Sequence, residues 1–111
     1  MQVNISTRHG HLRPDTQASI TEKVEKLARF FDRVTLIEVT ADMEHTESPH
    51  VELRLSLEHA DDLVAADRAS NVMAALDSAV HKMEQQLRKH KEKLRDHRVP
   101  SNKRDEEVTE D

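Results

Sequence analysis

The sequence predicts an α+β domain with the element order β-α-β-β-β-α, in which two helices pack on one face of a four-stranded sheet. Two segments carry apolar residues at the spacing of a helix that buries one face. The other segments alternate apolar and polar residues, as strands do when one face of a sheet is buried and the other meets water. The chain has 111 residues, which corresponds to one domain.

The first strand and the first helix are predicted from the beginning of the chain. Residues 2–8 alternate in polarity and place Val3 and Ile5 on one face, which indicates a strand. A helix is expected to begin at Pro14, because proline suits the first helical turn, and to end near Asp32. The apolar stripe of this helix consists of Ile20, Val24, Leu27 and Phe31.

Three further strands are predicted in the middle of the chain. They cover residues 34–44, 50–59 and 63–67, with turns at 45–49 and 61–62. Alternation places the apolar side chains of these strands toward the helices. We expect the opposite, solvent-facing side of the sheet to be acidic, with the carboxylates Glu38, Asp42, Glu52 and Glu58.

The last predicted element is a long helix over residues 71–97, which Ser70 or Asn71 can cap. Its apolar stripe comprises Leu76, Val80, Met83, Leu87 and Leu94. At about 100° per residue, a second line of polar and basic side chains runs beside this stripe. That line contains Lys82, Gln86, Lys89 and Lys93, and the other flank carries Arg88, Lys91 and Arg95. A coiled-coil seam is the weaker interpretation, because the apolar stripe is needed to cover the sheet.

Charge is segregated along the chain, whose net charge is −5. Residues 32–67 contain two basic and ten acidic side chains, whereas residues 82–99 contain seven basic and three acidic ones. A basic helix on an acidic protein has two explanations. It is either an ordinary solvated helix end, where cations suit the helix dipole, or a face that binds phosphates. Residues 98–111 are acidic and aperiodic, and we expect a disordered tail that follows a domain of residues 1–97.

Composition excludes several functional classes. The chain has no cysteine and therefore no disulfide or thiolate metal site, and its single glycine, Gly10, excludes a glycine-rich phosphate loop. Only Phe30 and Phe31 are aromatic, which argues against a reader of single-stranded RNA that stacks bases on rings. No apolar run approaches a membrane span or a signal-peptide core, so we expect a soluble protein without a membrane partner.

Neither a metal centre nor an enzyme active site is expected. None of the eight histidines forms an HxxxH pair, and His9 and His11 have no third ligand nearby in sequence. No nucleophile motif occurs, and the pair Asp61–Asp62 is typical of a turn. We therefore expect no cofactor, no metal and no small-molecule substrate.

The two predicted helices together suggest a binding surface. If they pack side by side, Lys23, Lys26 and Arg29 of the first can lie beside the line of Lys82, Gln86, Lys89 and Lys93 on the second. Such a positive strip suits the backbone phosphates of folded RNA, which is recognised by shape. The main alternative is a module that binds another protein through the same charged helices.

Several motifs resemble one known family, that of the ribosome hibernation-promoting factors and ribosome-associated inhibitors, once called sigma-54 modulation proteins. The opening MQVNIS resembles the first strand of the family, and TEKVEKLARFFDRV resembles its first helix. AALD at 74–77, followed by HKMEQQLRKHKEKL at 81–94, is similar to the pattern of its second helix. The resemblance covers residues 1–97 and implies the same β-α-β-β-β-α fold, like that of a double-stranded-RNA-binding domain.

The resemblance also implies a function. Family members occupy the channel for messenger and transfer RNA on the small ribosomal subunit of the 70S ribosome, stop translation and preserve idle ribosomes in stationary phase or stress. For this chain it implies a bacterial cytoplasmic protein that binds 16S rRNA. The basic and amide positions that match the family are Lys23, Lys26, Lys82, Gln86, Lys89, Lys91 and Lys93. Arg8, Arg29, Arg88 and Arg95 are added to the expected rRNA contacts on charge alone.

The chain departs from the family pattern at Met73, where members usually have tyrosine. Its length corresponds to a short form without the additional C-terminal domain of long members. The acidic composition of the tail is similar to the inhibitor branch, and such a tail can reach basic ribosomal proteins. Whether the protein promotes or opposes ribosome pairing stays open at this point, as do two other functions, free binding of structured RNA and regulation of a protein partner.

Overall fold

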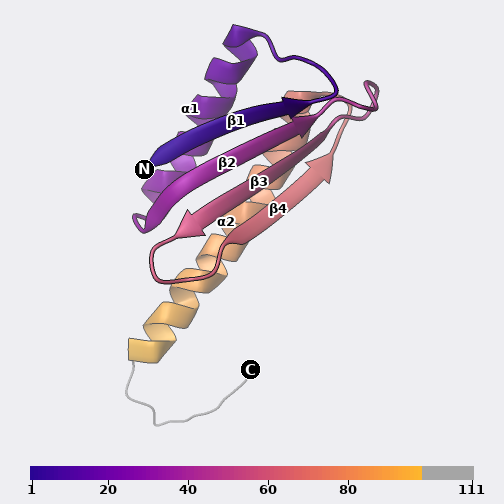
Figure 1. The fold of residues 1–111 in the computed structure, drawn as a ribbon. Helices are drawn as coiled ribbons and strands as arrows, with labels where there is room; N and C mark the ends of the chain where they lie inside the picture. Colours follow the sequence, from indigo (N-terminus) through magenta and orange to yellow (C-terminus); the bar gives the residue numbers. More distant parts are fainter. Residues whose placement is uncertain (99–111) are drawn as a thin grey trace.

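The computed structural model describes the backbone of residues 1–98 and the side chains of residues 1–29 and 31–92. It contains β1 (Gln2–Arg8), α1 (Pro14–Phe30), β2 (Val34–Asp42), β3 (His50–Leu57), β4 (Leu63–Arg68) and α2 (Val72–Arg98), as shown in Figure 1. This is the predicted element order, with strand and helix ends shifted by one or two residues. The predicted tail lies outside the described residues, apart from the backbone of Arg98.

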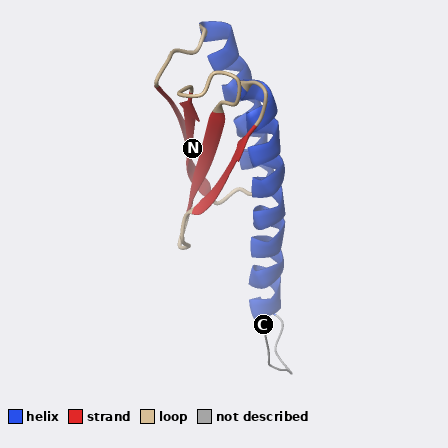
Figure 2. Ribbon diagram, turned by 90° about the vertical axis from the view of Figure 1, so that its right-hand side faces the viewer, coloured by secondary structure: helices blue, strands red, loops and turns tan. Residues whose placement is uncertain are grey.

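The four strands form one mixed sheet in the order β1-β2-β3-β4. β1 is parallel to β2, whereas β2–β3 and β3–β4 are antiparallel. A parallel pair needs a crossover connection, and α1 supplies it. Both helices lie on the same side of the sheet, and α2 continues well past the end of the strands (Figure 2). Over the described residues, neither helix has both the length and the apolar character that a membrane span requires.

The core lies between the sheet and the helices, as the alternating pattern predicts. The inward residues of β3, Val51, Leu53 and Leu55, are fully buried. They meet the apolar stripes of α1 and α2, whose fully buried members are Ile20, Val24, Ala75, Leu76, Ala79, Met83 and Leu87. Each large aliphatic side chain buried in this way contributes about 1.5–3 kcal/mol to folding. The packing therefore fixes how each helix is rotated about its axis, and with it the direction of every surface residue.

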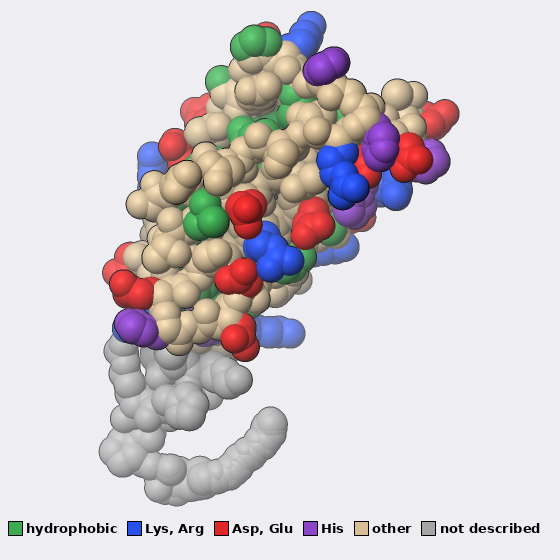
Figure 3. All heavy atoms as spheres, in the orientation of Figure 1, with side chains coloured by type: hydrophobic (Ala, Val, Ile, Leu, Met, Phe, Trp, Pro, Cys, Tyr) green, Lys and Arg blue, Asp and Glu red, His purple; other side chains and the backbone are tan. Residues whose placement is uncertain are grey.

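The outer face of the sheet is mixed in charge, so the prediction of an acidic face was wrong. Glu38 lies directly across from Arg54, and Asp42 lies between Arg8 and His50 in the cross-strand register. The alternation that turns the carboxylates outward also turns three arginines outward. Figure 3, which views this face, shows acidic and basic side chains interspersed over the strands.

The two helices begin next to each other and are capped differently. At α2, the Asn71 side-chain oxygen accepts a hydrogen bond from the amide of Ala74 at 2.9 Å, which identifies Asn71 as the cap of the two predicted alternatives. At α1, the N-cap residue is Arg13, which makes no side-chain capping hydrogen bond, and Pro14 occupies the first turn. The first-turn amides of α1 therefore stay open to other acceptors.

Candidate nucleic-acid interface

Two charged residues of α2, Asp77 and Lys82, lie on different flanks of the helix. Asp77 and Lys82 are five residues apart, which separates them by about 140° around the helix axis. Asp77 contacts α1, whereas Lys82 contacts β4. The expected single strip, with Lys23 beside Lys82, is therefore wrong. The core residues of α2 lie between these two flanks and press it onto the sheet, which separates the two cations.

The seam between α1 and α2 is closed by an ion pair. The Nζ atom of Lys23 lies 2.6 Å from a carboxylate oxygen of Asp77, and the Lys23 side chain keeps 41% of its surface exposed. Lys26 and Arg29 follow on α1 and are exposed to solvent. This side of the helical layer consequently presents lysines that can reach a phosphate, together with carboxylates that oppose it, which are Asp77 and the exposed Glu22 and Glu25 of α1.

The opposite flank of α2 covers the free edge of the sheet. β4 is an edge strand, and its carbonyl groups at Val64 and Ala66 accept hydrogen bonds from α2. Gln86 Nε2 donates to Val64 at 2.8 Å, and Lys82 Nζ donates to Ala66 at 3.2 Å. Unpaired strand edges invite other chains to pair with them, and these side chains cover part of that edge. Both residues were predicted as rRNA contacts, and the structure gives each a contact within the fold.

Asp67 joins β4 to this flank of α2 through Ser78 and Lys82. The sequence analysis did not identify it. It accepts hydrogen bonds from the Ser78 hydroxyl and from the amide of Arg68, and it lies 3.3 Å from Lys82 Nζ. The hydrogen bond from Ser78, followed by those from Arg68 and Lys82, lowers the pKa of Asp67 to about 2. The signal was present in the sequence, because strand alternation places Asp67 on the same inward face as Ala65.

The part of α2 beyond the sheet carries further cations. Arg88 and Lys89 are exposed, and Lys82 itself keeps 50% of its side-chain surface exposed. The Lys91 Nζ atom lies 6.0 Å from the centre of the Phe31 ring, which also meets the His90 ring edge to face at 5.3 Å. The side chains of Lys93, Leu94 and Arg95 lie outside the described residues, so their predicted roles stay predictions.

Arg8 does not belong to the helical layer. The inward residues of β1 are Val3, Ile5 and Thr7, so Arg8 faces the opposite side of the sheet, next to Asp42. An rRNA surface on the helices cannot include it without wrapping around the domain. The two-residue period of the strand determines this placement, and the predicted rRNA contact of Arg8 stays a prediction.

One histidine meets two carboxylates at the loop end of the sheet, which the sequence did not indicate. Candidate ligand atoms of His9, Asp42 and Glu44 lie within 4.8 Å of one another. His9 Nδ1 lies 2.9 Å from Asp42, and the Glu44 amide donates to the same carboxylate oxygen at 3.0 Å. These hydrogen bonds, with that of His9 contributing most, lower the pKa of Asp42 and account for the proximity of the groups.

Comparison with known proteins identifies relatives over most of the chain. The profile of a family described as Sigma 54 modulation protein / S30EA ribosomal protein matches residues 3–95. The chain is 30% identical over 98 residues to the ribosome hibernation promoting factor of Klebsiella oxytoca, which covers 87% of this chain and 100% of the relative. It is 34% identical over 93 residues to the factor of the same name from Azotobacter vinelandii, covering 84% of this chain and 85% of the relative.

Solved structures share the fold at lower sequence identity. A ribosomal subunit interface protein from Coxiella burnetii superposes with a TM-score of 0.74 at 18% identity, covering 82% of this chain and 98% of that one. The N-terminal domain of Thermus thermophilus Protein Y gives a TM-score of 0.70 at 17% identity, covering 81% of this chain and 99% of that one. At these identities the likeness establishes the architecture.

Proposed function

The chain belongs to the Sigma 54 modulation protein / S30EA ribosomal protein family, and from this premise we propose that it is a non-enzymatic factor that binds the ribosome and inhibits translation. The observation that carries the proposal is the family match over residues 3–95, together with curated relatives that are ribosome hibernation promoting factors. In this role the protein holds ribosomes idle and protects them, in the bacterial cytoplasm.

The binding partner in this proposal is the small subunit, alone or in the 70S ribosome. The contact is made to 16S rRNA in the channel that messenger and transfer RNA otherwise occupy. The helical layer supports this, because it presents exposed Lys26, Arg29, Arg88 and Lys89 on a rigid element. Cations on a helix attract backbone phosphates without reading bases, which suits recognition of a folded RNA by its shape.

The ion-paired lysines Lys23 and Lys82 extend this surface at its two opposite flanks, Lys23 at the seam with α1 and Lys82 beside β4. Lys23 and Lys82 each keep about half of their side-chain surface exposed, so each can contact a phosphate while its carboxylate partner holds it in place. The domain of residues 1–97 is the ribosome-binding unit in this proposal. In the same proposal, the acidic residues 98–111 bind basic ribosomal proteins.

Sedimentation through sucrose gradients tests the proposal. The protein is mixed with 70S ribosomes, separated subunits or an isolated rRNA hairpin, at low and high salt. We expect stoichiometric, salt-sensitive binding to the small subunit and the 70S ribosome, and inhibition of a cell-free translation reaction by the same protein. Equal binding to the isolated hairpin would instead identify a general structured-RNA binder, and absence from every ribosomal fraction would direct attention to protein partners.

A further inference from the structure

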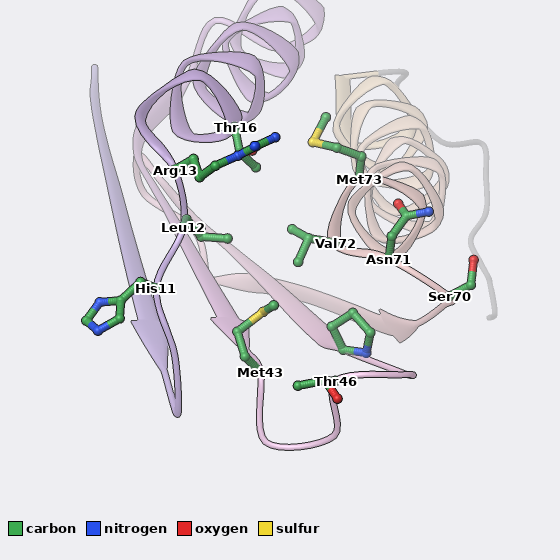
Figure 4. Close-up of a pocket in the computed structure, with 11 residues that line it drawn as sticks. His11, Leu12, Arg13, Thr16, Met43, Thr46, Ser70, Asn71, Val72 and Met73 are labelled. Atoms are coloured by element: carbon green, nitrogen blue, oxygen red, sulfur yellow. The ribbon is translucent and has the colours of Figure 1, made fainter.

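A pocket lies between the N-terminal ends of the two helices, apart from the cations described above. Its volume is about 330 Å³. Figure 4 shows it bounded by the start of α1, the start of α2 and the loop that follows β2. Ligand pockets range from roughly 300 to 1,000 Å³, so this one suits a single ring system and its substituents.

The walls of the pocket are apolar and come from three separate segments. Leu12, Met43 and Val72 point toward a common space, and Met73 lies above it on the side of α2 (Figure 4). Methionine is flexible and polarizable, so it adapts to a flat surface and contacts it through dispersion forces. A planar ring can therefore lie against these thioether side chains, and no Phe, Tyr or Trp lines the pocket.

The rim of the pocket is positive. The Arg13 side chain extends from the start of α1 toward Met73 (Figure 4), and it is a planar donor that suits phosphate. The lining residues include no carboxylate, although the chain contains 22 Asp and Glu residues. Asp15 lies in the first turn of α1 without lining the pocket. Apolar walls below a positive rim suit a ligand with a flat apolar part and an anionic group.

We propose that this pocket binds one unpaired nucleotide of RNA, with the base against Met43, Leu12 and Val72, below Met73, and the phosphate at Arg13. The inference rests on the proposed function, since the ribosome supplies the RNA. Arg13 and Lys23 are ten residues apart, which corresponds to about 15 Å along the chain at the rise of a helix. A single RNA segment can thus run from the pocket to the cations at the seam between the helices. Thr16 and Thr46 also line the pocket, and their hydroxyl groups can both donate and accept hydrogen bonds.

The four methionines of the chain allow a direct test by NMR. In the full chain labelled with carbon-13 at the methionine methyl groups, Met43 and Met73 report on the pocket. Met83, which is fully buried in the core, and Met1, which is 59% exposed, serve as internal controls. The probes are AMP, GMP, CMP and UMP, each added to about 10 mM, a concentration that fills a site of millimolar affinity. Inorganic phosphate and N-acetylphenylalanine amide are titrated in parallel.

We expect at least one nucleotide to shift the Met43 and Met73 signals in a saturable way and to leave Met83 and Met1 unchanged. Arg13→Gln should weaken this binding by about tenfold, because a charge-assisted hydrogen bond to phosphate is lost. Arg33→Gln is the matched control, since Arg33 is an exposed cation just past the other end of α1. This control should bind the nucleotide as the unchanged protein does.

Three results would overturn the proposal. These are no shift with any nucleotide, the same shifts with inorganic phosphate alone, and stronger shifts with the phenylalanine amide, which would identify a site for a protein side chain. Sedimentation of the same preparation with ribosomes keeps the two proposals apart. If the protein binds ribosomes but shows none of the nucleotide shifts, the nucleotide site is overturned and the proposed function stands. If it shows the nucleotide shifts but does not bind ribosomes, only the nucleotide site stands.

Discussion

Lys23 of α1 and Asp77 of α2 join the two helices through an ion pair in which nitrogen and oxygen lie 2.6 Å apart. The pair places a carboxylate in the middle of the surface that we propose for phosphates. An exposed ion pair of this kind contributes little to stability, about 0–1 kcal/mol. Its larger effect is on binding, because the Asp77 charge repels an approaching phosphate while it positions the lysine.

Asp77→Asn should therefore tighten binding to the small ribosomal subunit. A unit charge at about 4 Å in water contributes roughly 1 kcal/mol, so we expect an increase of up to about fivefold at low salt that fades as salt rises. Asp61→Asn is the matched control, because Asp61 is an exposed acid in the turn before β4. Unchanged or weaker binding of Asp77→Asn would show that Asp77 acts mainly by positioning Lys23.

Asp67 should make the fold sensitive to acid. Its pKa falls from 3.8 to about 2 in the folded protein, because its carboxylate accepts hydrogen bonds from Ser78, Arg68 and Lys82. A lowered pKa contributes stability that is fully present above pH 3.8 and is lost as pH falls toward about 2. Asp67→Asn should remove this part of the pH dependence of the free energy of unfolding, measured by urea denaturation across that range. A slope equal to that of the unchanged protein would contradict the assignment.

Gln86, one of the positions that match the family, should also stabilise the fold by holding β4. Gln86→Ala leaves the Val64 carbonyl of the edge strand without its hydrogen bond, and we expect a loss of about 1 kcal/mol in the free energy of unfolding. Gln85→Ala is the control, since the Gln85 side chain is exposed and meets only the exposed His81 ring among the described residues. Equal stability of the two variants would mean that Gln86 does not hold β4.

Gly10 should be intolerant of a side chain. A Cβ atom at this position would lie 2.9 Å from the Cβ atom of Met43, which is too close for two carbons. Gly10→Ala should cost roughly 1–3 kcal/mol in thermal or urea unfolding, as overpacked sites do. The double variant Gly10→Ala/Met43→Ala should recover little of this lost stability, because alanine at position 43 keeps the Cβ atom that makes the clash. Full recovery would show that the clash involves atoms further along the Met43 side chain.

The fold could be predicted from the sequence because each element repeats its pattern many times. β3 alternates over its whole length, and the apolar stripe of α2 recurs from Val72 to Leu87, so an error at one residue changes little. The pattern does not determine where each strand or helix ends. Met43 continues the alternation of β2, yet the strand ends at Asp42, and the Met43 amide donates to the Arg8 carbonyl at 2.8 Å.

For the candidate site, the sequence predicts which residue types it contains but not how they are arranged in space. The sequence identifies lysines on both helices, but the rotation of each helix about its axis depends on how the core packs. That rotation turns Asp77 toward Lys23 and turns Lys82 toward Asp67. His9 and Asp42 are likewise 33 residues apart in the chain, and only the parallel pairing of β1 with β2 brings them together.

The salt dependence of ribosome binding tests most directly whether the helical layer is the ribosome-binding face. Lys26→Gln/Lys89→Gln removes two exposed cations from the helices, and Arg54→Gln/Arg68→Gln removes two from the outer face of the sheet. The helical variant should bind more weakly and lose about one unit of slope in the logarithmic salt plot for each phosphate contact removed. The sheet variant should keep the slope of the unchanged protein. The opposite result, a lower slope for the sheet variant alone, would show that the ribosome binds the outer face of the sheet.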